Sequence, residues 1–447
     1  MTDTPALFFH PDAVESPGKD LVGRRAAGQS FAQGWLQYMP GAQVNAVTES
    51  RKDAEAFNTF ARALGEKRVL DVAVLRQQQD FAKFGTVFFP TPGYQSAAWQ
   101  RARADPRRCS LVGITHTVST RKIIESLHHQ MLQPVHPWDA IICTSRAVQS
   151  VVQRQMELAK EYIQQRFGAA RVPQPQLPLI PLGIHVDDFS QTDSDRDRMR
   201  RAFGAADDAI VVMTMGRLTS VEKANPAPLL IALQEVAQKA GKPLHLWMVG
   251  WSSREDELAL HQLAAKTLAP SITVQIIDGR DPDVRRHIWA GADIFTLPVD
   301  NIQETFGLVI VEAMASGLPV IASDWNGYRD LVVDGQTGFR IPTCCLEDAL
   351  PDLTSRLLTG EINYDHFLGR ATQTVTVSSD AATRALTALC GDPQLRSRLG
   401  TAGRQRAIEQ FDWSHVIRRY EKMWQEQTRQ LTAAVVSSQS ELKPPLR

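Results

Sequence analysis

The chain has 447 residues, enough for two or three domains with two sizeable hydrophobic cores. Its 49 basic and 49 acidic residues balance, which argues against a nucleic-acid-binding protein, whose binding face would be strongly basic. The cysteines at positions 109, 143, 344, 345 and 390 form neither a C-x-x-C pair nor a zinc-binding spacing. Such unpatterned cysteines fit a reducing cytoplasm.

No targeting or membrane-spanning segment is expected. The N-terminus lacks a basic region followed by an apolar run, so we predict no signal peptide. No stretch approaches the roughly 18 apolar residues that span a bilayer. We therefore expect a cytoplasmic protein with at most weak peripheral contact with a membrane. Residues 1–190 carry a small excess of basic residues, which would favour an anionic acceptor or membrane surface, although ordinary surface charge explains it more simply.

In the first half of the chain, short apolar segments alternate with amphipathic ones. The expected strands are 7–9, 43–47, 69–74, 87–89, 111–114 and 140–143, and the expected helices are 51–64, 96–103, 119–130 and 147–167. This alternation predicts a parallel sheet covered by helices on both faces. Ligands of such sheets bind at the carboxyl ends of the strands.

A proline-rich stretch at 173–181 precedes a second alternating half. Its expected strands are 209–216, 244–250, 271–277, 293–297 and 319–322, with helices beginning near Pro226 and covering 308–316. Asp193, Asp195 and Asp197 have a D-x-D-like spacing but lie in a polar linker, so we assign them to helix capping and solvation and predict no catalytic metal.

The C-terminal part departs from simple alternation. We predict that residues 344–380 form a helical insertion, that 394–427 form closing helices, and that the polar residues from about 428 are frayed.

The most informative pattern runs from Asn301 to Ser323. Thr305, Phe306 and Gly307 lie where the helix 308–316 should begin, and the first amides of a helix favour an anionic or oxygen-rich ligand. Glu304 precedes this point and Glu312 lies within an otherwise apolar helix. A buried carboxylate is unfavourable unless it is paired or bound to a ligand, so the pattern predicts ligand binding.

Other candidate residues follow predicted strands. Arg217 and Lys223 lie in a loop beyond a strand that ends at Gly216, and a guanidinium with an ammonium suits a diphosphate, although two cations six positions apart are unremarkable alone. His116 follows the strand 111–114 and is either functional or a capping or core residue. Gly250 either admits a nucleotide to the backbone or simply ends a strand.

The segment Glu304-Thr-Phe-Gly-Leu-Val-Ile-Val-Glu312-Ala-Met-Ala-Ser-Gly-Leu-Pro-Val resembles the E-x7-E donor site of a large family of retaining glycosyltransferases, family four in the usual classification. Weaker likeness runs from about Gly23 to the C-terminus. The resemblance implies an α/β fold of the GT-B type, with two Rossmann-like domains facing across a cleft. It implies an acceptor-binding domain at 1–190, a donor-binding domain at 191–410, and a helix and tail at 411–447 that cross back to the first domain.

The resemblance also implies roles for these residues. Arg217 and Lys223 would hold the donor's phosphates, Glu304 the sugar hydroxyls and Glu312 the nucleotide ribose, with His116 near the reacting carbon. The remaining donor-binding positions would be Gly23, Gly216, Gly250, Thr305, Phe306, Gly307 and Leu308. Gly23 lies at a helix entrance beside two arginines, where a plain turn glycine is equally consistent. The family's usual glycine after the lysine is Ala224 here.

These inferences predict a retaining, metal-independent hexosyltransferase of carbohydrate biosynthesis that needs no cofactor. It would move a sugar from a nucleotide-diphosphate-sugar donor to a glycan, lipid or small-sugar acceptor. One alternative is a nucleotide-sugar epimerase or sugar-phosphate synthase of the same fold. A second is a nucleotide-sugar-binding protein without turnover.

Overall fold

The computed structural model describes residues 4–14, 23–75, 81–94, 96–104, 107–239 and 241–436. The chain forms two compact units: unit 1 combines Met1–Gly183 with Trp413–Arg447, and unit 2 is Ile184–Asp412. Within the described ranges every helix is too short or too polar to cross a membrane.

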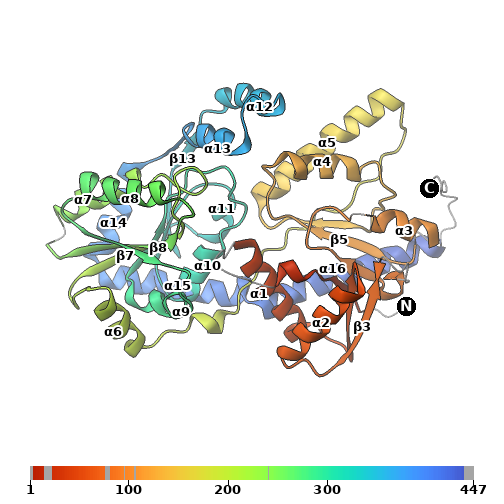
Figure 1. Cartoon of the computed structure of the whole chain (residues 1–447), viewed down its shortest axis with the longest axis horizontal. Helices are drawn as coiled ribbons and strands as arrows, with labels where there is room; N and C mark the ends of the chain where they lie inside the picture. The colour runs from red at the N-terminus through yellow and green to blue at the C-terminus, as the bar shows by residue number, and fades with distance from the viewer. Residues whose placement is uncertain are drawn as a thin grey trace. The chain divides into compact units, whose positions relative to one another are not determined.

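Unit 1 is built on a parallel sheet with the strand order β3-β2-β1-β4-β5-β6. Its strands β3 and β5 are labelled in Figure 1. Its strands are β1 (Ala6–Phe8), β2 (Gln43–Thr48), β3 (Val69–Val74), β4 (Thr86–Phe88), β5 (Ser110–Ile114) and β6 (Ala140–Ile142). Its helices are α1 (Gly23–Tyr38), α2 (Arg51–Ala63), α3 (Ala97–Ala104), α4 (Arg121–Gln130), α5 (Arg146–Phe167) and α16 (Trp413–Val436), with short 3-10 turns η1 (Pro11–Ala13) and η3 (Phe81–Phe84).

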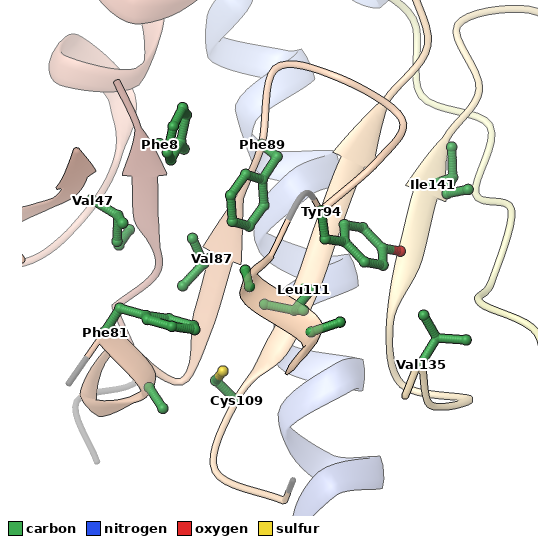
Figure 2. Close-up of a cluster of buried hydrophobic side chains, with 14 of the residues drawn as sticks. Phe8, Val47, Phe81, Val87, Phe89, Tyr94, Cys109, Leu111, Val135 and Ile141 are labelled. Carbon is green, nitrogen blue, oxygen red and sulfur yellow. The ribbon is translucent and has the colours of Figure 1, made fainter. Parts of the chain in front are cut away.

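Successive strand residues point to opposite sides of this sheet, and both faces are buried because the residues on each side are apolar and packed under helices. Val87 and Phe89 belong to one core, in which the rings of Phe8 and Phe89 stack with centroids 5.1 Å apart (Figure 2). Phe88, between them, belongs to the core of the opposite face. Helices α3, α4 and α5 supply side chains to the first core, and α1, α2 and α16 to the second. This arrangement confirms the predicted sheet with helices on both faces.

Helix α16 completes unit 1. A Cβ on Gly34 of α1 would lie 2.7 Å from Cγ of Trp413, so only glycine lets the indole pack this closely. The rings of Trp35 and Trp424 pack edge to face with centroids 5.1 Å apart. The expectation that the chain frays from about residue 428 is wrong for residues 428–436, because α16 continues to Val436 and buries Leu431; the remainder of that stretch lies outside the described residues.

Unit 2 contains a second parallel sheet, with the order β12-β11-β10-β7-β8-β9. Its strands are β7 (Ile210–Arg217), β8 (Leu244–Trp251), β9 (Thr273–Asp278), β10 (Ile294–Leu297), β11 (Val320–Ser323) and β12 (Gly338–Ile341). Its helices include α6 (Asp193–Ala202), α7 (Ala227–Ala237), α8 (Glu255–Leu268), α9 (Pro282–Gly291), α10 (Leu308–Ala315), α11 (Tyr328–Leu331), α14 (Ser379–Gly391) and α15 (Pro393–Phe411), preceded by the turn η4 (Val186–Phe189).

Acidic residues cap helices of unit 2, and one of them, Asp195, belongs to the D-x-D-like group assigned to helix capping. Asp195 forms a capping box with Thr192 at the start of α6. Asp281 caps α9 by accepting hydrogen bonds from the backbone amides of Asp283 and Val284.

The segment predicted as a helical insertion is only partly helical. It begins and ends with two short strands, β13 (Thr343–Cys345) and β14 (Val375–Val377), which pair antiparallel. Between them lie the 3-10 turn η5 (Glu347–Ala349) and the helices α12 (Leu350–Leu358) and α13 (Tyr364–Thr372) (Figure 1). We call residues 343–377 the hairpin segment.

Candidate functional site

The candidate site of unit 2 lies where its strand order reverses. Strand β7 is flanked by β8 on one side and by β10 on the other, although β10 follows β9 in the chain. Ligands of open parallel sheets bind beyond the carboxyl ends of the strands at such a switch point. The loop 218–226, which we call the cation loop, follows β7, and the loop 298–307, which we call the carboxylate loop, follows β10. The predicted residues Arg217, Lys223 and Glu304 therefore belong to neighbouring strand ends.

Lys223 and Glu304 form an ion pair in which the ammonium donates to Oε2 of the carboxylate. The hydroxyl of Tyr328 donates to the same oxygen at 2.5 Å. Burial acts to raise the pKa of Glu304, but the charge and hydrogen bond of Lys223, then the hydrogen bond of Tyr328, outweigh it and the pKa is lowered. Glu304 is thus held ionised, with one oxygen fixed by two donors.

Arg217 is paired as well, with the carboxylate of Glu222 in its own loop. Both side chains are more than one third exposed, at 41% for Arg217 and 34% for Glu222. The two cations of the site thus each face a carboxylate, and the four side chains together carry no net charge.

Two hydrogen bonds join the loops, each between a side chain of the carboxylate loop and the backbone of the cation loop. Asn301 donates from Nδ2 to the carbonyl of Val221 at 2.7 Å, and the amide of Asn225 donates to Oδ1 of Asp300 at 3.2 Å. Burial raises the pKa of Asp300 to about 6. The cation loop and the carboxylate loop therefore behave as one bonded structure.

The cation loop is also fixed from α8 by a buried carboxylate. Glu257, only 5% exposed, accepts from the amide of Ser220 at 3.1 Å and from its hydroxyl at 3.0 Å. Ala224 replaces the glycine that the resemblance led us to expect, yet the loop closes normally. Its amide and that of Lys223 donate to the carbonyl of Thr219, and among the described residues Asn326 alone of the non-glycine residues has a positive φ.

Helix α10 begins directly after the carboxylate loop. Gly307 caps it with φ +107°, and a Cβ at this position would lie 2.5 Å from Cε1 of Tyr328. Glycine is therefore required both for the backbone conformation and for contact with the tyrosine ring. Within the described part of the chain, the amides of Gly307 and Leu308 have no acceptor, and they remain available to an anion.

Glu312 lies one turn further into α10 and is half-buried. Burial raises its pKa, and the charge of Arg285 opposes the shift only in part. Among the described residues its carboxylate has no hydrogen-bond or ion-pair partner. It is separate from the Lys223–Glu304 pair, and it is the kind of group that a ligand hydroxyl would satisfy.

The two predicted glycines at strand ends are register partners, Gly216 in β7 and Gly250 in β8. A Cβ on Gly250 would lie 1.8 Å from the carbonyl oxygen of Gly216, so glycine is required there for strand packing. A cavity of about 40 Å³ lies against Gly216, Arg217, Lys223, Asn225 and His261, with mostly apolar side chains around the rest.

Two predicted residues belong to unit 1. His116 follows β5, as expected, and its Nε2 donates to the carbonyl of Pro90 at 3.1 Å. Gly23 is the first residue of α1, and residues 15–22 before it lie outside the described residues.

Several residues that complete the site were not predicted. Tyr328 is fully buried beside Glu304, Glu222 pairs with Arg217, and Asn301 and Asp300 join the two loops. Only Asp300 and Asn301 had a usable signal, because they follow the apolar strand β10 just before Glu304.

The sequence matches known glycosyltransferases over part of its length. Residues 195–375 match the family described as Glycosyl transferases group 1. The lipopolysaccharide 1,2-N-acetylglucosaminetransferase of Salmonella typhimurium is 29% identical over 198 residues, which are 43% of this chain and 50% of that protein. The D-inositol 3-phosphate glycosyltransferase of Corynebacterium aurimucosum is 26% identical over 288 residues, 60% of this chain and 66% of that protein. The chain thus spans about half to two thirds of the length of these relatives.

Solved structures share the fold. A protein of Anabaena, HepE, in complex with UDP and glucose aligns with a TM-score of 0.57 at 17% identity, covering 95% of this chain and 100% of that one. A glycosyltransferase from Rickettsia africae aligns with a TM-score of 0.59 at 13% identity, covering 95% and 98%. The two parallel-sheet, Rossmann-like units thus have the fold of these solved structures, which confirms the predicted α/β fold with two Rossmann-like domains.

Proposed function

We propose that this protein transfers a sugar from a nucleotide-diphosphate-sugar donor, which binds in unit 2. The observation that carries the proposal is the Lys223–Glu304 pair, which joins the loops after β7 and β10. Glu304 is followed in the chain by the Gly307 and Leu308 amides at the start of α10. The match of residues 195–375 to group 1 glycosyl transferases supports it. HepE, which shares the fold, was crystallised with UDP and glucose.

The diphosphate would be held by charge and by dipoles. Arg217 and Lys223 would neutralise the negative charge that grows on the departing nucleoside diphosphate, aided by the amides of Gly307 and Leu308. Arg217 already faces Glu222, so the incoming phosphates would have to compete with that carboxylate, whereas the ammonium of Lys223 has further N–H donors and can bind a phosphate oxygen while it stays paired with Glu304. No metal or cofactor is required in this scheme, since the protein's own cations and amides take the charge.

The carboxylates would recognise hydroxyl groups. Glu304 is ionised and has one oxygen fixed by Lys223 and Tyr328, so its other oxygen would accept from a hydroxyl of the donor sugar. Glu312 would accept from the nucleotide ribose, which would supply the partner that its half-buried carboxylate lacks among the described residues. Gly23, Gly216, Gly250, Thr305 and Phe306 would complete the donor site through backbone contacts.

Unit 1 would bind the acceptor, a glycan, a lipid-linked glycan or a small sugar, and would supply His116 to the reacting carbon. The anomeric configuration would be retained and the transferred group would be a hexose. A cytoplasmic location with at most peripheral membrane contact completes the proposal.

The first test is calorimetric binding of UDP, GDP and ADP to the wild-type protein and to Arg217→Ala. We expect one nucleotide to bind selectively and its affinity to fall in the variant. Lys83→Ala is a matched control, because Lys83 pairs with Asp71 in unit 1 at exposures of 43% and 35%, close to those of Arg217 and Glu222. If none of the three nucleotides binds the wild-type protein, the donor site is refuted.

An enzyme must also be told from a binding protein without turnover. His116→Ala is expected to abolish sugar transfer while leaving nucleotide affinity unchanged, because His116 is proposed to contact the reacting carbon and is not among the groups proposed to hold the nucleotide. A wild-type protein that binds the nucleotide but neither hydrolyses nor transfers the matching nucleotide sugar would instead be a binding protein.

A further inference from the structure

The hairpin segment has its own small hydrophobic core, and two side chains of the candidate site pack into it. The buried members are Leu353 in α12, Ile362, and Phe367 and Leu368 in α13. Partly buried against them lie Val221 and Ile302. These two residues come from the cation loop and the carboxylate loop, so one cluster joins both loops to the helices of the segment.

Side-chain hydrogen bonds also join the hairpin segment to the carboxylate loop. Asn301, whose Nδ2 is bonded to the carbonyl of Val221, also donates to Oγ1 of Thr372 at 3.4 Å. Gln303 donates from Nε2 to the hydroxyl of Tyr364 at 3.4 Å. Thr372 ends α13 and Tyr364 begins it, so both ends of this helix contact the carboxylate loop.

The contacted residues are close in the chain to the groups that would bind the donor. Val221 lies two positions before Lys223, and Ile302 and Gln303 come directly before Glu304. Displacement of either backbone would separate the ammonium from the carboxylate, and a small misplacement of binding groups strongly reduces binding and turnover. A loop that is already ordered before the ligand arrives loses little conformational entropy on binding.

We propose that the hairpin segment is a positioning element of the donor site, acting through Leu368, Thr372 and Tyr364 on the two loops that carry Lys223 and Glu304. This inference rests on the proposed function for what the loops bind. The ordering of the loops themselves does not depend on it. The segment touches the loops and contributes no residue of its own to the phosphate site described above.

The antiparallel pairing of β13 with β14 allows the helices to be removed cleanly. Cys345 pairs with Val375, and the amide of Leu346 donates to the carbonyl of Thr374 at 2.9 Å. Residues 347–373 are therefore replaced by Asn-Gly, the preferred two-residue turn for closing such a pair. The strands keep their register, and Val377, part of the main core of unit 2, stays in place.

The primary readout is hydrogen exchange of the ligand-free protein over residues 218–225 and 299–304. We expect faster exchange in both loops after excision and unchanged exchange in β7 and β8. Nucleoside diphosphate affinity is expected to fall about tenfold. Unchanged exchange in both loops would overturn the inference, even if affinity fell for another reason.

Point variants give the same test without a deletion, should the excised protein fail to fold. Leu368→Ala removes a side chain that is 1% exposed in the cluster, and Leu358→Ala, at 56% exposure in α12, is the matched control. We expect faster loop exchange and weaker binding in Leu368→Ala, restoration in Leu368→Ile, and wild-type behaviour in the control. Equal behaviour of the Leu368 and Leu358 alanine variants would overturn the positioning role.

The two proposals fail in different ways. A wild-type protein that binds no nucleoside diphosphate refutes the proposed function and the donor part of this inference together. Wild-type binding with unchanged affinity and unchanged loop exchange in the excised protein refutes the positioning role alone.

Discussion

Replacing Glu222 by glutamine is expected to strengthen the binding of a nucleoside diphosphate. In the ligand-free protein Glu222 holds Arg217, one of the two cations proposed to receive the phosphates. An incoming diphosphate has to displace this carboxylate and then remains beside a negative charge. Glu222→Gln removes that charge and leaves a neutral amide of nearly the same shape.

The size of the effect follows from the exposure of the pair. Because both side chains are more than one third exposed, the pair has the character of a surface salt bridge, which contributes about 0 to 1 kcal/mol. Freeing Arg217 should therefore tighten binding by up to about fivefold. Since exposed charges are screened by salt, the gain should shrink as ionic strength rises.

The assay is calorimetry of the selected nucleoside diphosphate at low and at high sodium chloride. Asp71→Asn is the control, because Asp71 pairs with Lys83 in unit 1 at closely matched exposure and the substitution changes the net charge equally. Affinity that falls in Glu222→Gln, or a gain equal to that of Asp71→Asn, would refute the idea that Glu222 competes for Arg217.

Three further substitutions test the site. Lys223→Met should weaken nucleoside diphosphate binding by roughly a hundredfold, about 3 kcal/mol, and raise the pKa of Glu304 in a pH titration of binding. Gly307→Ala should lower the free energy of unfolding by about 2 kcal/mol or more in urea melts, since alanine is strained at φ +107° and meets Tyr328. Burial raises the pKa of Asp300 from 3.8 to about 6, so its contribution to the free energy of unfolding is complete below pH 3.8 and is lost as the pH rises through 6. The wild-type protein should therefore lose about 3 kcal/mol of stability over this range, and Asp300→Asn should not, as measured by urea melts at pH 4 to 8. Unchanged nucleotide affinity in Lys223→Met, or urea melts of Gly307→Ala or Asp300→Asn that match those of the wild type, would contradict the corresponding prediction.

The sheets were predictable because parallel strands buried on both faces leave continuous apolar runs. Expected strands such as 69–74 and 244–250 agree with β3 (Val69–Val74) and β8 (Leu244–Trp251) to within a residue. The edge strand β12 of the second sheet was not predicted. Strands β13 and β14 were also missed, because each has three residues and pairs only with the other. The end of α16 was missed because Thr428, Arg429 and Gln430 are polar, although Leu431 is buried and residues 433–436 are apolar.

The candidate site was predictable only where strand ends place residues together. Arg217, Lys223 and Glu304 follow β7 and β10, and the order of the sheet brings their loops side by side. Their partners were not predictable, since Tyr328 follows a different strand and Thr372 lies 71 positions after Asn301. Contacts of this kind depend on tertiary packing and produce no periodic pattern in the sequence.

The division of unit 1 between the two ends of the chain has a consequence for biosynthesis. Residues 1–183 leave the ribosome before the whole of unit 2, and the helix that packs against Phe31, Trp35 and Phe88 is made after it. Until Trp413–Val436 emerges, one face of the first sheet lacks one of its three covering helices, and part of its apolar surface is exposed to aggregation. Unit 2, which is continuous from Ile184 to Asp412, is free to fold first, so the second half of the protein is expected to mature before the first.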